Sequence, residues 1–463
     1  MSEPARLVPP VAAARGRSSR RWPAAFAPRF YVGLIVGLVW LGPAWWNPRF
    51  AYAMLAWDVL LLVAWLADFR RLPRPTEIEV SRTWLGAVSL NVETAVTIEL
   101  RNFSDTPCHA ILYDDIPRAL RPEPPQMELD APRFLSARGR YSVRPIERGD
   151  ITTGPVFLRL QSPMKLAERW AAADLDQTIR VYPNLQEPNQ HALYLIRTRQ
   201  VEQEKRLKRQ PGLGREFESL REYREGDEPR DICWTASARR AKLITKVYHA
   251  ERSQAVLIVL DAGRLMLARV DRGPVSLTKL DHAAGAALTL AQVALHSGDR
   301  VGLLAYGRKP QARLAAGRGA AHLRAFLDAL ALVRGELNEA NHPAAADLLL
   351  GLHTQRCLVV WLTDLAETAA TPEVIEAASR LLRRHLVLFA AIGNPQLGTL
   401  VKSMPESPQE MYRYVATLEM VERRELLLRR LREQGVLAME VAPGHLATGL
   451  VNEYLRVKER GLL

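Results

Sequence analysis

The chain has 463 residues, of which 48% are hydrophobic and 24% are charged, and this balance excludes a largely disordered protein. Lys and Arg outnumber Asp and Glu by 63 to 50, so the net charge of +13 favours an anionic partner, either a membrane surface or a nucleic acid. The three cysteines, Cys108, Cys233 and Cys357, are far apart in the sequence. Their number and spacing argue against a disulfide framework and a zinc site, and fit a reducing cytosol.

The first seventy residues contain a basic stretch followed by two apolar runs. Residues 1–29 carry six arginines and a single acid among Pro, Ala and Ser, a composition that predicts a disordered basic arm. The apolar runs at 30–46 and 50–67 are separated by only "NPR". Because each run is near the roughly 17–20 residues needed to cross a bilayer, we predict a transmembrane helical hairpin over 30–69.

Basic residues flank this hairpin on both sides, with Arg70, Arg71 and Arg74 after the second run. The positive-inside rule therefore predicts a multi-pass protein of the inner membrane, with the N-terminus and the soluble domains in the cytoplasm, and anionic lipid accounts for much of the basic excess. "AYA" at 51–53 is similar to a signal-peptidase site, but the arginine cluster after the second run favours retention. Asp58 is either in contact with a partner helix or shallow enough to reach water.

Residues 76–190 form short runs with alternating apolar and polar positions, punctuated by Pro, Gly and Asp. This pattern predicts a β-rich domain of immunoglobulin-like type. It contains no grouping of His, Asp and Glu that suggests catalysis, so a spacing or binding role is expected.

Residues 254–463 alternate apolar strands with amphipathic helices, a pattern that predicts an α/β doubly wound domain with a parallel sheet. The predicted strands include 255–263 and 356–365, and the predicted helices include 408–433 and 445–459. Sites in such sheets form where the strands end. Asp261 and Asp364 stand at two predicted strand ends, so we expect them at one edge of the sheet.

Between these regions, a connecting segment at 191–253 contains "GREFESLREYREGDEPRDICWTASARR". With the two apolar runs, the β-rich region and "ERGDITTGPVFL" at 147–158, this segment resembles the bacterial "domain of unknown function 58" family. The positions that carry the resemblance are Gly214, Glu216, Phe217, Leu220, Arg221, Tyr223, Gly226, Asp227, Arg230, Ile232, Trp234, Ala238 and Arg239. The resemblance implies a von Willebrand factor A-like domain at the C-terminus and association with a MoxR-type AAA+ ATPase.

Domains of the von Willebrand factor A type usually hold Mg²⁺ through an acid-x-Ser-x-Ser loop, a Thr from a second loop and an Asp from a third. Here Asp261 is followed by Gly263 and Leu265 instead of serines, and the second loop at 306–322 has no Ser or Thr. Asp364 would represent the third loop. Mg²⁺ requires near-octahedral oxygen ligands, so we expect no physiological metal and no cofactor. Asp261 and Asp364 should instead accept hydrogen bonds from the backbone or from arginine.

Three interpretations compete for the segment around Cys233 and Trp234. Cys233 could serve a transglutaminase-like or hydrolase activity, but the nearest downstream base, His249, is only sixteen positions away. The basic stretch at 197–210 could contact nucleic acid, but interleaved acids would cancel much of its field.

We favour the third interpretation, a structural clamp. In it Gly226 and Asp227 form a turn, and Trp234 is buried as an anchor. Arg221, Arg230 and Arg239 would then pair with carboxylates and lock the β-rich domain against the first strand of the α/β domain.

Taken together, these features predict a non-enzymatic adaptor, anchored in the inner membrane, that contacts a MoxR-type AAA+ ATPase. The contact would involve the strand-end face around Asp261, 307–311 and Asp364, and we expect neither nucleic acid nor a small-molecule substrate as a ligand. The alternatives are a cysteine-dependent enzyme that uses Cys233 and a nucleic-acid-binding membrane protein.

Overall fold

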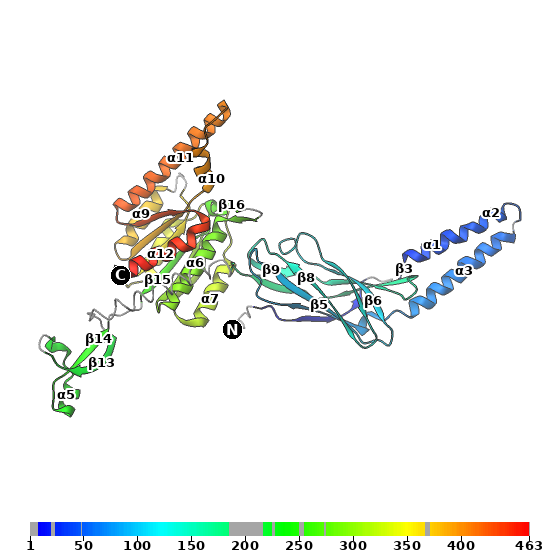
Figure 1. Ribbon diagram of the computed structural model, residues 1–463, viewed down its shortest axis with the longest axis horizontal. Helices are drawn as coiled ribbons and strands as arrows, with labels where there is room; N and C mark the ends of the chain where they lie inside the picture. The colour runs from blue at the N-terminus through cyan, green and yellow to red at the C-terminus, as the bar shows by residue number, and fades with distance from the viewer. Residues whose placement is uncertain are drawn as a thin grey trace. The chain divides into compact units, whose positions relative to one another are not determined.

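The computed structural model describes residues 8–19, 24–47, 49–184, 216–224, 227–249, 254–272, 275–365 and 371–462. The chain divides into two compact units, Met1–Asn184 and Leu185–Leu463 (Figure 1). Each unit buries its own set of hydrophobic side chains.

The first unit contains an antiparallel β-sandwich. One sheet has the order β1-β4-β5-β8 and the other the order β2-β11-β10-β6-β7, with β3 also paired to β11 and with β9 and β12 paired to each other. The strands are β1 (Ala12–Arg15), β2 (Arg17–Ser18), β3 (Ala24–Phe26), β4 (Ile78–Trp84), β5 (Thr94–Asn102), β6 (Cys108–Asp114), β7 (Gln126–Ala131), β8 (Ser136–Val143), β9 (Gly149–Thr153), β10 (Val156–Gln161), β11 (Ala167–Ala173) and β12 (Gln177–Val181). In β4 and β5 every second side chain is buried, because one face of the sheet covers the core.

The prediction of a disordered arm over 1–29 is wrong for residues 12–18 and 24–26. β1 pairs with β4, and both β2 and β3 pair with β11, so these strands contribute to both sheets. The composition of the segment does not predict these strands, because backbone hydrogen bonds to the edges of the two sheets hold them. Such bonds do not require large apolar side chains. Gly16 lies where the chain passes from one sheet to the other, and a Cβ there would be 2.6 Å from the carbonyl oxygen of Pro75.

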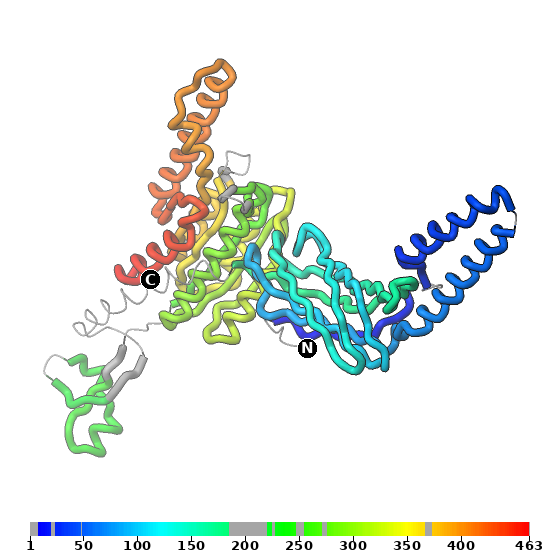
Figure 2. Tube along the Cα trace, turned by 45° about the vertical axis from the view of Figure 1, so that its right-hand side comes forward, coloured from blue at the N-terminus to red at the C-terminus, as the bar shows by residue number. Residues whose placement is uncertain are grey.

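An apolar helical hairpin extends from the sandwich, with its two arms side by side (Figures 1 and 2). Its elements are α1 (Pro28–Gly37), a 3-10 turn (Leu38–Trp40), α2 (Leu41–Ala44) and α3 (Arg49–Arg70). In the described part of the chain, one helical run, Arg49–Glu77, is long and apolar enough to cross a membrane, and only 6% of its apolar window is buried. The run Pro28–Ala44 is shorter, so two full spans, and with them a multi-pass topology, are not supported.

The two arms of the hairpin approach closely at two glycines of α1. A Cβ on Gly33 would lie 2.9 Å from the Leu61 side chain, and the indole N–H of Trp57 donates to the Gly33 carbonyl at 3.0 Å. A Cβ on Gly37 would lie 3.2 Å from a carboxylate oxygen of Asp58. Asp58 therefore faces the neighbouring helix, which is one of the two positions that the sequence left open.

The second unit is built on a six-stranded sheet of order β19-β18-β15-β20-β21-β22. All neighbouring pairs are parallel except β18 with β19, so the sheet is parallel with one antiparallel edge strand. Its strands are β15 (Ala255–Asp261), β18 (Arg300–Tyr306), β19 (Pro310–Gly317), β20 (Leu358–Thr363), β21 (Leu386–Ile392) and β22 (Leu437–Val441). The central strands are buried almost throughout, as expected for a sheet covered by helices on both faces.

Helices cover this sheet on both sides (Figure 1). The helices are α6 (Lys279–His296), α7 (Gly319–Leu332), α8 (His342–Leu352), α9 (Thr371–Leu382), α10 (Pro395–Lys402), α11 (Pro408–Glu433) and α12 (Leu446–Glu459). α6 contacts both α7 and α12 on one face, whereas α8, α9 and α11 share one hydrophobic core with the strands on the other. The second unit is thus the doubly wound arrangement that the sequence predicts.

Two small hairpins complete the second unit. β16 (Arg269–Arg272) pairs with β17 (Val275–Thr278), just before α6. β13 (Glu216–Glu222) pairs with β14 (Ile244–His249), and the short helix α5 (Trp234–Arg240) lies between them in the chain. This β13–β14 hairpin holds most of the segment that resembles the known family.

Candidate functional site

The carboxyl ends of β15, β18 and β20 meet at one edge of the sheet, where ligands bind in open α/β folds. Asp261 is the last residue of β15, and Asp364 follows the last residue of β20. Both acids are nearly inaccessible, with 3% of Asp261 and 8% of Asp364 exposed. The structure therefore brings the two sequence-predicted acids to the same edge, as buried groups that need partners.

Asp261 is satisfied by neighbouring protein groups. One carboxylate oxygen accepts the backbone N–H of Gly263 at 2.7 Å, and the other accepts the hydroxyl of Thr363 at 2.6 Å. Burial raises the pKa of Asp261, and the nearby His342 and the Thr363 hydrogen bond partly oppose this rise. Burial likewise lowers the pKa of His342, which favours the neutral imidazole.

A short polar chain extends from His342 into the sheet. The indole N–H of Trp361 donates to the Tyr306 hydroxyl oxygen at 2.7 Å. The same oxygen lies 2.9 Å from Nδ1 of His342, and the tautomer of the imidazole decides which of the two groups donates. These hydrogen bonds fix the position of the His342 ring next to Asp261.

Asp364 is held between two cations. Nζ of Lys279 lies 2.6 Å from one carboxylate oxygen, and Nη2 of Arg424 lies 2.7 Å from the other. Arg424 also donates to the carbonyl oxygens of Leu365 and Ile392 at 2.7 and 2.6 Å, and its Nε lies 2.7 Å from Glu440. We call Lys279, Asp364, Arg424 and Glu440 the strand-end ion cluster. Two positive and two negative groups balance within it.

The residues at this edge do not fit the magnesium site of a von Willebrand factor A domain. Gly263 and Leu265 offer no hydroxyl, and a Cβ on Gly263 would lie 2.8 Å from the backbone nitrogen of Ala340. The Thr363 hydroxyl is engaged by Asp261, and Asp364 is engaged by Lys279 and Arg424. Mg²⁺ needs several free oxygen ligands in octahedral geometry, and these side chains are already committed to partners within the protein.

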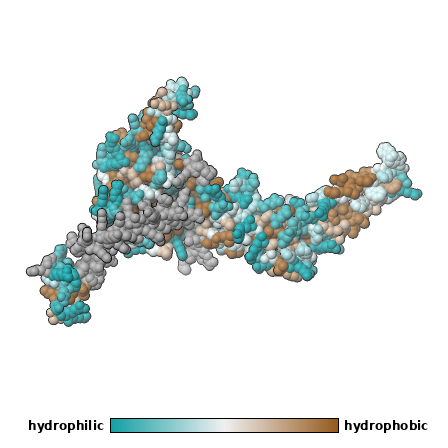
Figure 3. All heavy atoms as spheres, viewed as in Figure 1, coloured by the Kyte–Doolittle hydropathy of each residue, from teal (hydrophilic) through white to brown (hydrophobic). Residues whose placement is uncertain are grey.

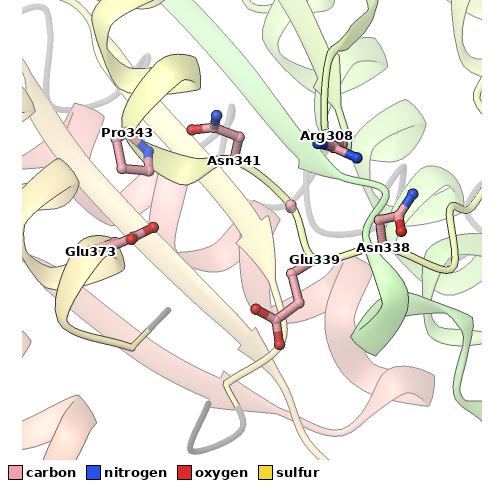
Figure 4. Close-up of a pocket in the computed structure, with 7 residues that line it drawn as sticks. Arg308, Asn338, Glu339, Asn341, Pro343 and Glu373 are labelled. Atoms are coloured by element: carbon pink, nitrogen blue, oxygen red, sulfur yellow. The ribbon is translucent and has the colours of Figure 1, made fainter. Parts of the chain in front are cut away.

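An open pocket of about 520 Å³ lies on the surface of the second unit (Figure 4). It is lined by Arg308, Asn338, Glu339, Ala340, Asn341, Pro343 and Glu373. A smaller hollow of about 20 Å³ shares Glu339 and Ala340 with it and reaches Asp261 and His342. Of the predicted loop 307–311, Arg308 lines the pocket. Asp364 lines neither hollow.

Both signs of charge face the pocket. Glu373, near the start of α9, and Arg308, after β18, lie on opposite sides of it (Figure 4). Glu339 pairs with Arg264 at 3.2 Å, and Asn341 caps the N-terminus of α8. Such a surface, polar and open, suits the backbone and charged side chains of another protein better than a small apolar molecule, which needs an enclosed apolar pocket.

Part of the signature segment forms the expected turn. Arg221 pairs with Asp227 at 2.6 Å, and Asp227 also accepts the backbone N–H of Arg224 at 2.9 Å. The Tyr223 hydroxyl donates to the Asp227 carbonyl at 3.3 Å. The hydrogen bonds from Arg221 and from the Arg224 backbone lower the pKa of the Asp227 carboxyl, with the Arg221 bond as the largest cause. Gly214 and Gly226 lie outside the described residues.

The expectation that Trp234 is a buried anchor is wrong. Trp234 begins α5 and is 67% exposed. Arg230 pairs with Glu228 inside its own turn, and Arg239 is exposed. The reason is the size of the β13–β14 hairpin, which holds α5 through the backbone of Ile244 and has too few residues to bury a large aromatic ring. Trp234 is therefore not a buried anchor within its own unit.

Cys233 has no base among its described contacts. Its Sγ lies 3.6 Å from the Thr235 hydroxyl, whose hydrogen bond is the main cause of a lowered pKa of the thiol. The side chain of His249 lies outside the described residues, as does the basic stretch 197–210.

Comparison with known proteins gives one family match. Residues 219–403 match the family described as "Protein of unknown function DUF58", which confirms the resemblance for that part of the chain, less than half of its length. No curated protein matches. A similar solved structure is the crystal structure of conserved hypothetical protein BatB from Bacteroides thetaiotaomicron. It is 17% identical and covers 45% of this chain and 100% of that chain, with a TM-score of 0.31, too low to support an argument about the fold.

Several residues of the site were missed by sequence reasoning. Lys279, Arg424, Thr363 and His342 complete the environment of the two acids. Lys279 is the first residue of an amphipathic helix, and Arg424 lies in a helix rich in charged residues. A basic side chain at such a position is ordinarily exposed to solvent, so the neighbouring sequence does not predict that either one is buried. The threonine directly before Asp364 was the one available hint, since a hydroxyl at a strand end can reach the next strand.

Proposed function

We propose that this protein is a non-enzymatic adaptor that is anchored to a membrane and binds another protein at the strand-end edge of a von Willebrand factor A-like unit. The observation that carries the proposal is the position of Asp364 between Lys279 and Arg424. These cations neutralise the acid from inside the protein. The edge is therefore preformed, and its neighbouring pocket is free to meet a partner directly.

The order of the sheet supports the assignment to the A-like class. Five parallel strands with an antiparallel strand at one edge, covered by helices on both faces, place the loops after β15, β18 and β20 together. The family match over 219–403 is consistent with this assignment. The resemblance to that family supplies the candidate partner, a MoxR-type AAA+ ATPase.

The apolar hairpin supports the membrane anchor. β3 precedes α1 and β4 follows α3, and both strands belong to the same sandwich, which supports an anchor that enters the bilayer and leaves it on the same side, whether or not its shorter arm spans the bilayer in full. Arg29, Arg70 and Arg71 stand at the two ends of the hairpin. By the positive-inside rule that side is the cytoplasm, and the membrane is the inner membrane.

The proposal of a non-enzymatic role is supported by the hydrogen bonds of the acids. Both oxygens of Asp261 accept hydrogen bonds from protein groups, and Asp364 is engaged by two cations. An acid or base catalyst must reach its substrate, and these carboxylates are occupied. If the protein were instead a cysteine-dependent enzyme, replacement of Cys233 by serine would abolish its function in cells.

The test is co-purification of the full chain from membranes in mild detergent, followed by detection of a MoxR-type AAA+ ATPase. Arg308→Glu and Glu373→Arg reverse charges in the pocket, and each should lower the recovered ATPase by about fivefold or more, because like charges then face each other in the complex. Arg429→Glu and Glu425→Arg make the same changes at exposed positions of α11 and serve as matched controls. Absence of the ATPase would contradict the partner. Equal recovery with pocket and control variants would contradict the binding site.

A further inference from the structure

The base of the apolar hairpin is bonded to one turn of the sandwich. Asp68, near the end of α3, is an acid with only 1% of its surface exposed. One of its oxygens accepts the Ser162 hydroxyl and the Leu166 backbone N–H, the latter at 3.2 Å, and the other accepts the Met164 N–H at 3.4 Å. Residues 162–166 form the turn between β10 and β11, which we call the β10–β11 turn.

The first helix is bonded to the same turn. The backbone N–H of Ala27 donates to the Leu166 carbonyl at 3.0 Å, and Arg29 donates to the Met164 carbonyl at 3.4 Å. The β10–β11 turn is thus held against the bases of both helical arms. The position of the turn relative to the hairpin is fixed by these hydrogen bonds, of which the bond from Ser162 to Asp68 is buried.

A second set of contacts fixes the exit of α3. Arg169 of β11 donates to the carbonyl oxygens of Leu72 and Pro73 at 3.1 and 2.7 Å. Its guanidinium carbon lies 4.5 Å from the centroid of the Phe69 ring, a cation–π distance. The hairpin and the sandwich therefore meet at a defined angle.

While its backbone is bonded to the hairpin, the β10–β11 turn leaves its side chains exposed. Met164 is 53% exposed, and Pro163 and Lys165 are also exposed. An exposed methionine and an exposed lysine thus lie on a turn whose backbone is held in place.

The surroundings of the turn indicate which partner it fits. The hairpin above the turn is covered with exposed apolar side chains (Figure 3). At its base the rings of Phe26, Phe30 and Trp65 cluster, with centroid distances from Phe26 of 4.3 and 4.8 Å. Aromatic rings at the end of an apolar segment are typical of the layer where hydrocarbon meets headgroups.

The charge at this level is positive. Arg29, Arg70, Arg71 and Lys165 are exposed at the helix bases and in the turn, whereas Asp68 is buried. Lys and Arg side chains at this depth reach lipid phosphates while their stems stay in the apolar layer. A bilayer that contains anionic lipid is complementary to both the charge and the apolar side chains.

We propose that the β10–β11 turn is a second membrane contact, in which Met164 enters the interfacial layer and Lys165 binds anionic phospholipid headgroups together with the arginines at the helix bases. The inference rests on the proposed membrane anchor and adds to it. The hydrogen bonds of Asp68 hold the turn at the membrane surface, and they orient the sandwich with this end on the bilayer.

The experiment uses the full chain, with Cys233→Ser so that the remaining native thiols are buried. A nitroxide is attached at Met164→Cys or, as a control, at Ile146→Cys, an exposed position that follows Pro145 in the loop between β8 and β9. The protein is reconstituted into vesicles of phosphatidylcholine alone or with phosphatidylglycerol. Flotation reports anchoring, and spin-label accessibility to oxygen and to a water-soluble nickel chelate reports depth.

The proposal predicts that the label at 164 is reached by oxygen and protected from the nickel chelate, more so with phosphatidylglycerol, and that the label at 146 shows the reverse. Lys165→Glu should weaken the effect of phosphatidylglycerol, whereas Lys402→Glu, the same change in the other unit, should not.

If the protein floats but the label at 164 is open to the nickel chelate, the turn does not touch lipid and the inference fails while the anchor stands. A label shielded from both reagents would show a protein partner or a second copy over the turn, and would overturn the assignment to lipid. Protein that does not float would overturn both proposals.

Discussion

Both units of the protein contain a buried ion cluster, and the two clusters that are compared, around Arg82 and around Asp364, differ in how completely their hydrogen bonds are made. In the sandwich, Arg82 of β4 is fully inaccessible and pairs with Asp114 of β6. Its remaining N–H groups donate to Thr153, Leu175 and Gly154. Arg82 therefore uses all five of its donors, and the cluster joins the two sheets.

The strand-end ion cluster of the second unit is less complete. Asp364 and Arg424 lie within ion-pair distance, but among the described residues Oδ1 of Asp364 and Nε of Arg424 make no well-aligned hydrogen bond. The sandwich cluster is saturated with hydrogen bonds, as expected of a buried network that stabilises a fold. The strand-end cluster is not, and in the proposed function it holds the edge near which a partner binds.

The largest effect is expected from breaking the sandwich cluster. Asp114→Ala leaves Arg82 as an uncompensated buried charge and removes the acceptor of the Tyr141 hydroxyl, so the free energy of unfolding of the first unit should fall by about 3–5 kcal/mol. Hydrogen exchange of β4 and β6 amides at increasing urea measures this locally. Arg138→Ala, which removes an exposed pair with Glu99, should change it by less than about 1 kcal/mol. Equal effects of the two variants would contradict the account.

A smaller effect is expected at the strand end. Asp364→Asn should cost the second unit about 2–3 kcal/mol, because Arg424 keeps its carbonyl partners and Glu440. Combining Lys279→Met with Asp364→Leu removes both charges together and should recover most of the loss. Hydrogen exchange of the β15 and β20 amides measures the free energy of unfolding of the single variant and of the double variant. If the loss of stability in the double variant equals the sum of the losses in the two single variants, the cluster is not a coupled unit.

Thiol reactivity tests whether the two interiors are equally closed. Burial raises the pKa of Cys108 in the sandwich and of Cys357 in the second unit to about 12, whereas the pKa of the partly exposed Cys233 is lowered. Because the thiolate is the reactive form, native labelling with iodoacetamide near neutral pH should modify Cys233 alone. Mass spectrometry of the labelled peptides reads this out. Rapid labelling of Cys357 with protected Cys108 would show that the second interior opens.

The smallest effect is expected at the β13–β14 hairpin. Trp234→Ala should change the stability of either unit by no more than about 0.5 kcal/mol, because the indole is largely exposed. Thermal unfolding of the full chain in detergent measures this. A fall of several kcal/mol in the free energy of unfolding would show that the indole is buried against another part of the chain, and would support the clamp.

Patterns of local periodicity predicted much of the second unit. The predicted helix 408–433 coincides with α11, and the strand ends of Asp261 and Asp364 do meet at one edge. These features follow from the spacing of apolar residues, which is visible in a short window. Lys279 lies 85 residues from Asp364, and no window reveals that an ordinary helical lysine will become the buried partner of that acid.

The failures have physical reasons as well. β1, β2 and β3 gain their order from the free edges of β4 and β11, so their own arginine-rich composition misleads. Trp234 was expected to be buried as the anchor of a clamp, but the hairpin that carries it has no core large enough to cover its ring.

In the proposed function, Lys279 and Arg424 neutralise Asp364 in the place that a divalent cation would otherwise take at the strand-end edge. Calorimetric titration of the purified full chain with Mg²⁺ tests it most directly, with the pocket variant Glu373→Arg as a control for weak surface binding. The account predicts no binding in the submillimolar range for either protein. Stoichiometric submillimolar binding that is lost in Asp261→Asn would contradict it.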